Sequence, residues 1–117
     1  MKLKYKLQML LILVLLGTIT AQNKNTTQSS IFGTILDLNS SKPLEFTNIV
    51  LFSLPDSTQA LGTVTNSNGY FELNNIQTGK YYLRISFIGY DNHFTEEMLI
   101  KDNLAIDLGK IYLNPVS

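Results

Sequence analysis

Three aromatic side chains in the C-terminal half of this sequence could form a binding surface: Tyr82, Tyr90 and Phe94. Exposed rings can stack on sugars or pack against another protein, because each combines a large apolar face with a polarised edge. The alternative is that the rings serve the core and ordinary cross-strand pairs, as strand alternation predicts for Tyr81 and Phe87. We predict Tyr82, Tyr90 and Phe94 as the ligand or partner contacts, with that alternative left open.

The residues that usually perform catalysis do not form a recognisable set. His93 is the only histidine, and it follows the turn residues Asp91 and Asn92, which favours an exposed loop position. Glu96 and Glu97 are adjacent, and neighbours on a strand point to opposite faces, so they cannot act as a carboxylate pair. No Gly-x-Ser-x-Gly nucleophile motif is present. We therefore predict no catalytic residues and no enzymatic activity.

The sequence also predicts no metal site and no cofactor. It contains no cysteine, which excludes disulfides, thiolate zinc ligands and a lipid-modified N-terminal cysteine. Residues 64–69 look like half of a calcium loop, but Val64 stands at the first ligand position and Asn75 stands where a bidentate glutamate is required. The turn chemistry of asparagine and glycine explains this segment without a cation.

The first 21 residues have the layout of a signal peptide. Lys2, Lys4 and Lys6 precede a run over residues 7–16 that is apolar except for Gln8, and mostly small residues lead up to Ala21, after which we place cleavage. The alternative is a retained membrane anchor, but a span needs about 20 apolar residues and this run is about half as long. Residues 22–30 are polar throughout and predict a flexible lead-in.

Removal of the leader changes the charge of the chain. Six basic and nine acidic residues remain after residue 21, so the net charge becomes −3. A nucleic-acid partner requires clustered lysine and arginine, so we predict none.

Short apolar runs divided by turn residues make up the rest of the chain and indicate strands. In residues 80–87, Tyr81, Leu83, Ile85 and Phe87 alternate with polar neighbours, which is typical of a strand with one buried face. The predicted strands cover residues 31–37, 46–54, 62–65, 70–73, 80–87, 94–100 and 108–113. The third and fourth of these are predicted to form a hairpin around residues 66–69, where asparagine and glycine accept positive φ.

Seven short strands without a crossover helix predict an all-β fold, a seven-stranded antiparallel Greek-key β-sandwich over residues 31–114. Residues 46–54 are apolar on both faces, so that strand is predicted to be central or covered on its outer side. The predicted core comprises Ile35, Ile49, Leu51, Phe71, Leu73, Ile76, Leu83, Ile85, Phe87 and Ile111.

Three segments of the chain resemble the carboxypeptidase regulatory-like domain family. Residues 31–49 resemble its opening, a Gly-x-Val-x-Asp strand that here contains Gly33 and Asp37, followed by Pro-Leu. Residues 63–73 resemble its Thr-Asp-x-x-Gly-x-Phe-x-Leu hairpin, with Asn66 where aspartate is usual, and residues 78–90 resemble its Gly-x-Tyr-x-Leu and Gly-Tyr segment. The resemblance implies a transthyretin-like (prealbumin-like) sandwich without catalytic residues.

The resemblance also implies a role at the N-terminus of TonB-dependent outer-membrane receptors of Gram-negative bacteria, in the periplasm. This chain stops before a receptor plug or barrel, so we expect either a truncated receptor or a stand-alone domain. Related enzymes that hydrolyse a purine-derived substrate end in Tyr-Arg-Gly-Ser, which this chain lacks. We therefore expect an exported accessory domain with a protein partner in the cell envelope, bound by strand-edge pairing. The alternative is a stand-alone carbohydrate-binding or adhesive module whose ligand is a glycan.

Overall fold

The computed structural model describes residues 28–116, which contain eight strands. These are β1 (Ser29–Asp37), β2 (Asn48–Ser53), β3 (Thr58–Val64), β4 (Tyr70–Ile76), β5 (Gly79–Ser86), β6 (His93–Phe94), β7 (Met98–Ile100) and β8 (Ala105–Leu113). The predicted signal peptide over residues 1–21 and most of the predicted lead-in lie outside the described residues. In the described part of the chain, no helix has the length and hydropathy needed to cross a membrane.

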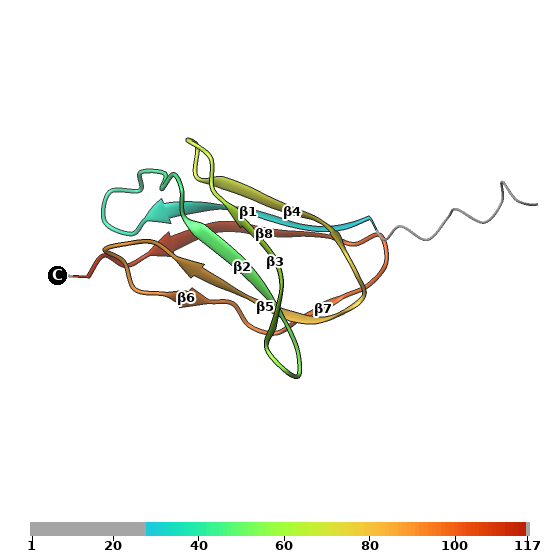
Figure 1. The fold of residues 1–117 in the computed structure, drawn as a ribbon. Coiled ribbons are helices and arrows are strands. Elements are labelled where there is room, and N and C mark those ends of the chain that lie inside the picture. Colours follow the sequence, from blue (N-terminus) through green and yellow to red (C-terminus); the bar gives the residue numbers. More distant parts are fainter. Residues whose placement is uncertain (1–27, 117) are drawn as a thin grey trace, which may run out of the picture.

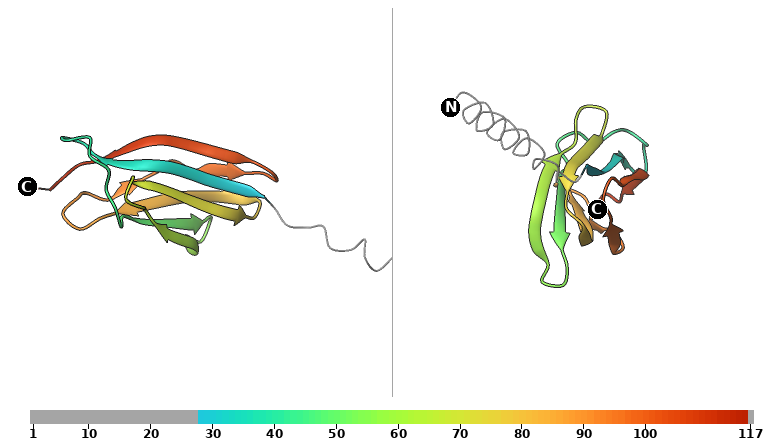
Figure 2. Two further views of the ribbon diagram at one scale, coloured as in Figure 1. Left: turned by 90° about the horizontal axis from the view of Figure 1, so that it is seen from above. Right: turned by 90° about the vertical axis from the view of Figure 1, so that its right-hand side faces the viewer.

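The strands form two sheets packed face to face (Figure 1). One sheet has three strands in the order β4-β1-β8, and the other has the order β3-β2-β5-β6 with β7 also paired to β5. The views in Figure 2 show the layers, with β1 and β8 on one side and β2 and β3 on the other. The predicted all-β sandwich is confirmed, and β2 is central as expected, because it pairs with both β3 and β5.

Eight strands occur where seven were predicted, because the predicted strand over residues 94–100 is divided into β6 and β7. At the break, the Thr95 hydroxyl accepts a hydrogen bond from the Leu83 amide at 2.8 Å, and the Thr95 amide donates to the Leu83 carbonyl at 3.0 Å. A side chain thus replaces one backbone partner in the ladder. Regular pairing with β5 resumes at Met98.

The strand β8 runs parallel to β1, whereas an antiparallel sandwich was predicted throughout. After β7 the chain crosses back to the three-stranded sheet and enters β8 at the end where β1 begins. There the Ser30 amide donates to the Leu104 carbonyl at 2.9 Å. β1 itself begins at Ser29, two residues before the predicted start, and Ser29 is buried with its hydroxyl hydrogen-bonded to the Lys101 carbonyl.

The core lies between the two sheets, where inward-facing side chains alternate with outward-facing ones. The predicted core residues are buried, except that Phe87 and Ile111 are half-buried and pack against the others. Five further residues complete the core, namely Ile31, Leu44, Tyr81, Ile100 and Leu113. Each large apolar side chain removed from water contributes about 1.5–3 kcal/mol, so this alternation is the main source of stability.

The predicted hairpin between residues 62–65 and 70–73 is wrong. The turn forms as expected, since the Asn66 side-chain oxygen accepts hydrogen bonds from the Asn68 and Tyr70 amides at 2.9 and 3.0 Å. However, β3 pairs with β2 and β4 pairs with β1, so the turn carries the chain from one sheet to the other. Asparagine and glycine specify the tight turn, but they do not specify which strands pair on either side of it.

Buried hydrogen bonds and one glycine fix this crossing. The Thr65 hydroxyl donates to the Leu44 carbonyl at 2.5 Å and accepts the Thr47 amide at 2.9 Å. On the other side of the turn, the Gly69 carbonyl accepts the Ile35 amide at 2.8 Å, with Gly69 at φ 75°. A Cβ at Gly69 would overlap the Ile35 carbonyl oxygen, so only glycine fits here.

We expect Gly69→Ala to lower the free energy of unfolding by about 3 kcal/mol, because it adds a left-handed backbone penalty to a backbone clash. Gly109→Ala is the matched control, since Gly109 has φ 65° with nothing within 4 Å of an added Cβ. It should cost only about 1 kcal/mol. Urea unfolding followed by fluorescence or circular dichroism measures both values. Equal losses in the two variants would contradict the proposed close approach at Gly69.

Candidate functional site

The structure brings together two of the three predicted contact residues, Tyr82 and Phe94, on the outer face of the five-stranded sheet. Tyr82 lies opposite Phe52 on β2, and its ring stacks on the Phe52 ring with centroids 5.2 Å apart and planes at 16°. Its other neighbour is Phe94 on β6, with ring centroids 6.4 Å apart. The three rings therefore form a row across β2, β5 and β6.

Arginine 84 completes this surface. Arg84 lies opposite Val50 on one side and Phe94 on the other, and its guanidinium carbon is 5.1 Å from the centroid of the Phe52 ring. This is cation–π geometry, in which the ring face attracts the positive charge. We call Val50, Phe52, Tyr82, Arg84 and Phe94 the aromatic–arginine face. Phe94 is 57% exposed and the other four are half-buried.

Phe52 and Arg84 were absent from the sequence-based prediction of this site. The available signal was the apolar pattern on both faces of residues 46–54, which indicated that the outward side chains of β2 had partners. Their identity depends on the register between β2 and β5, which pairs Phe52 with Tyr82 and Val50 with Arg84. A shift of the β2–β5 register by one residue would change every such cross-strand pair.

Polar side chains border the aromatic–arginine face. Asn48 and Ser86 are paired at one end of it, on the same side of the sheet. Gln59 is paired with Phe52, and its side-chain amide lies beside Gly62. These groups place hydrogen-bond donors and acceptors around an apolar centre.

Tyr90, the third predicted contact residue, lies apart from this face. Its ring packs beside Phe87, with centroids 5.8 Å apart, and its hydroxyl donates to the Asp37 carboxylate at 2.6 Å. The hydrogen bond joins the end of β1 to the turn after β5. Tyr90 therefore has a structural role that the sequence did not predict.

Asp37 is the centre of a small hydrogen-bond network. Its carboxylate also accepts the amides of Asn39 and Ser40 at 2.8 and 2.7 Å. The Tyr90 hydroxyl, followed by the Ser40 amide, lowers the pKa of Asp37 from its ordinary value of 3.8 to about 2. The same hydrogen bond raises the pKa of Tyr90 above its usual 10.0. At neutral pH Asp37 is a charged acceptor held by its neighbours, which does not suit a general acid.

The side chains considered for catalysis are dispersed over the surface. His93, Glu96 and Glu97 are all exposed, and Glu97 forms an exposed ion pair with Lys80 at 3.7 Å. Across residues 28–116, no three histidine, aspartate or glutamate side chains lie close enough together to hold a metal ion.

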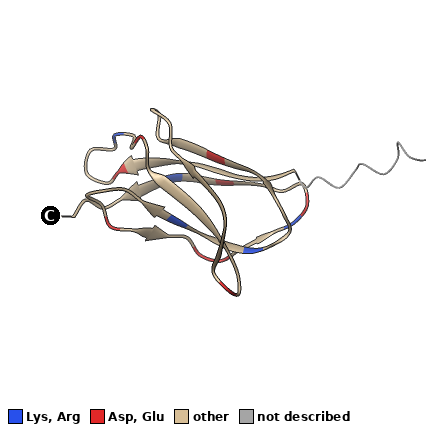
Figure 3. Ribbon diagram, viewed as in Figure 1, with Lys and Arg blue, Asp and Glu red and all other residues tan. Residues whose placement is uncertain are grey.

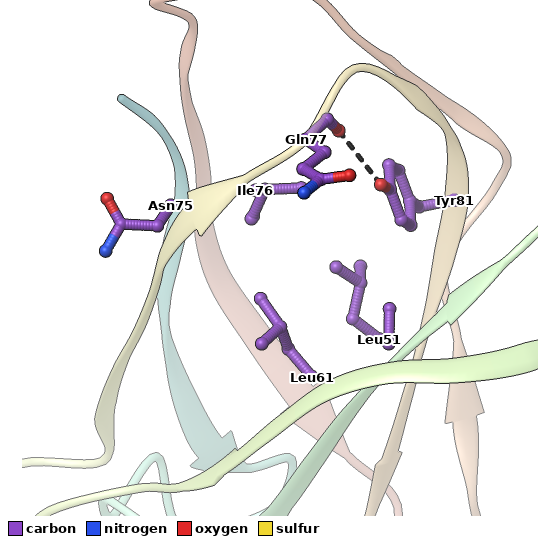
Figure 4. A pocket seen from close by; sticks show the side chains of 7 residues that line it. Leu51, Leu61, Asn75, Ile76, Gln77 and Tyr81 are labelled. Carbon is purple, nitrogen blue, oxygen red and sulfur yellow. Dashed lines mark hydrogen bonds between the residues drawn. The ribbon is translucent and has the colours of Figure 1, made fainter. Parts of the chain in front are cut away.

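A cleft of about 230 Å³ opens between β3 and β4, at the side where the two sheets diverge (Figure 4). The side chains of Leu51, Leu61 and Ile76 point toward one another there, so the centre of the cleft is aliphatic. Its rim is polar, and the Tyr81 hydroxyl donates to the Gln77 carbonyl at 2.9 Å. Such a cleft suits an apolar side chain of a partner.

The β3 edge beside this cleft is uncharged. The edge strand β4 carries Glu72, β8 carries Asp107 and Lys110, and the segment between β6 and β7 carries Glu96 and Glu97. Charged side chains on an edge discourage pairing with another chain. Figure 3 shows this distribution, with β3 lacking any charged segment.

The backbone of β3 has groups that point away from β2. The Thr65 amide donates to the Thr47 carbonyl at 3.0 Å and the Thr65 carbonyl accepts the Phe46 amide at 3.0 Å, so both groups face the β2 side. The N–H and C=O groups of successive residues point alternately to the two sides of a strand, within the plane of the sheet. Those of Gly62 and Val64 therefore point away from β2, toward the open edge. This is the geometry that accepts an additional strand.

We expect Tyr90→Phe to raise the pKa of Asp37 from about 2 toward 3.8, because the largest stabilising hydrogen bond is lost. A depressed carboxylate pKa stabilises the fold above pH 3.8, and this contribution is lost as the pH falls to about 2. The variant should therefore lose stability at neutral pH and show a weaker dependence on pH between 4 and 2. NMR titration of the Asp37 carboxyl carbon measures the pKa, and an unchanged value would contradict the assignment.

Comparisons with known proteins agree with this architecture. The family model of the CarboxypepD_reg-like domain matches residues 31–111. Similar solved structures include the Bacillus anthracis TIE protein, with 16% identity, a TM-score of 0.64, and 77% of this chain and 18% of that chain covered. BcpA, the major pilin subunit of Bacillus cereus, has 19% identity, a TM-score of 0.58, and coverage of 77% and 31%.

The 5-hydroxyisourate hydrolase of Klebsiella pneumoniae is also similar, with 18% identity, a TM-score of 0.58, and coverage of 76% of this chain and 92% of that chain. Among curated protein sequences, none matches this chain significantly. Sequence identities this low show that these proteins share a fold, and they give no information about a shared activity.

The residues that resemble the family pattern have structural roles here. Asp37 and Tyr90 bond to each other, Asn66 and Gly69 form the crossing turn, and Gly33 packs closely against the Phe71 ring. The sandwich, these contacts and the match over residues 31–111 lead to one conclusion. The chain belongs to the CarboxypepD_reg-like domain family.

Proposed function

We propose that this chain is a non-catalytic interaction domain that binds a protein partner by accepting a strand at β3. The observation that carries the proposal is the uncharged, exposed β3 edge beside a cleft with an aliphatic centre and a polar rim. An unpaired edge exposes backbone donors and acceptors that a partner strand can satisfy. The edge strands β4 and β8 carry charges that oppose such pairing, and Glu96 and Glu97 lie between the short edge strands β6 and β7.

The cleft suggests how the partner strand would be recognised. Leu61 lies opposite Leu51, and both side chains face the inside of the sandwich. On a partner strand added beside β3, the residue opposite Leu61 would place its side chain at the cleft. A volume of about 150 Å³ lined by apolar groups is enough to hold a benzene molecule. The open cleft of about 230 Å³ has room for one large side chain of the partner, whose apolar part would lie against Leu51, Leu61 and Ile76.

We further propose that the domain works at the cell envelope of a Gram-negative bacterium, as the N-terminal periplasmic extension of a TonB-dependent outer-membrane receptor. Membership in the CarboxypepD_reg-like family supports an accessory domain. The basic, apolar and small-residue order of residues 1–21 supports export through a cleaved signal peptide. The partner would then be another protein, or another part of the same receptor, in the periplasm.

Export predicts a defined mature N-terminus. When the full chain is expressed in a Gram-negative host, we expect it in the osmotic-shock fraction with a mass that begins at Gln22. Replacing Leu11 and Leu13 by Asp should stop processing and leave the precursor in the cytoplasm, because the apolar run is interrupted. Mass spectrometry of each fraction distinguishes these forms. An unprocessed wild-type chain in the membrane pellet would support the anchor instead.

Strand addition at β3 predicts a position-specific crosslink. A photoreactive amino acid at Val64 should give a protein adduct in the native cells, whereas one at the similarly exposed Tyr112 on β8 should not. Gly62→Pro should abolish the adduct, because it removes an outward amide while leaving the β2 ladder intact. Leu61→Lys, which places a charge at the cleft, should act in the same way.

Thermal unfolding shows whether these two variants remain folded. An adduct that persists in a folded Gly62→Pro protein would contradict strand addition. Formation of the adduct from Tyr112 instead, or from neither position, would contradict it as well.

A further inference from the structure

The aromatic–arginine face is separate from the proposed strand-accepting site. Its side chains point outward from the five-stranded sheet, whereas Leu51 and Leu61 point into the sandwich from the same strands. Phe94 is 57% exposed, although the core already buries a full set of apolar side chains. An exposed ring next to two half-buried rings and an arginine, on one face of a small domain, indicates a binding surface.

The positive charge of Arg84 indicates that the ligand of this face carries a negative group. Arg84 lies over the Phe52 ring, and its cross-strand neighbours Val50 and Phe94 are apolar. The ion pair found in the described residues joins Lys80 to Glu97 and does not involve Arg84. A guanidinium on an aromatic surface offers several planar N–H donors that match a carboxylate.

The shape and border of the face favour a sugar ring. The Phe94 ring is exposed and offers an aromatic surface to polarised C–H groups, while Tyr82 stacks on Phe52 and supports Phe94 from the side. Asn48, Ser86 and Gln59 lie around these rings and can exchange hydrogen bonds with hydroxyl groups. A polyphosphate would require several clustered cations, and this face has one central arginine.

The geometry points to a binding site for acidic saccharides on the aromatic–arginine face, with a uronate carboxylate on Arg84 and its sugar ring on the neighbouring exposed ring of Phe94. The surface is open, so the affinity per sugar is weak, with a Kd of about 1 mM, and rises with the number of sugars. This site does not depend on the strand-accepting function of β3.

Tetragalacturonate is a suitable probe, and its fully methyl-esterified form is the matched control without charge. In NMR titrations of the purified ¹⁵N-labelled protein, we expect amide shifts centred on Phe52, Tyr82 and Phe94. Arg84→Gln should weaken binding by at least about tenfold, because a charge-assisted hydrogen bond is lost. Phe94→Ala should weaken it too, while Tyr112→Ala on β8 should bind as the wild type does. Binding should also weaken as NaCl is raised.

The methyl ester should bind much less than the acid, and acetate should produce no comparable shifts. Equal binding of ester and acid would overturn the assignment of the carboxylate to Arg84. Shifts confined to β3, unchanged affinity in both Arg84→Gln and Phe94→Ala, or absence of saturable shifts would overturn the site itself. Phe94 is exposed, so Phe94→Ala keeps the test decisive if Arg84→Gln affects folding.

Discussion

The turn between β3 and β4 sets how the two sheets are arranged. Gly69 must approach the backbone of Ile35 while Thr65 and Thr47 bond around the Leu44 carbonyl on the other side. These contacts send the chain from one sheet to the other without a connecting helix. They also leave β3 at an edge and hold β4 apart from it, which opens the cleft near Leu61.

The residues of the family pattern maintain the scaffold, whereas the surfaces proposed for binding lie elsewhere. Asp37, Asn66 and Gly69 all take part in contacts within the domain. The β3 edge and the aromatic–arginine face consist of other residues, which take no part in these contacts. This separation explains how one fold can serve a pilin and a hydrolase, because function resides in sites carried by the fold.

Strands β2 and β5 serve both sides of the five-stranded sheet. Their inward residues, such as Leu51 and Leu83, are fully buried and supply the core. Their outward residues, such as Phe52 and Tyr82, are half-buried and stack on each other. The apolar pattern on both faces of β2 therefore has two physical causes, core packing on one side and aromatic pairing on the other.

The amino-acid sequence was sufficient to predict the all-β class, the inward residues such as Leu83 and Ile85, and the tight turn at Asn66. These features follow from backbone alternation and local turn chemistry, which act over a few residues. The three-dimensional structure was needed to show that β3 and β4 separate, that β8 runs parallel to β1, and that Tyr90 bonds to Asp37 and lies apart from Tyr82. These choices depend on contacts between residues far apart in the chain, and the free energy that selects among such pairings is not contained in any local pattern.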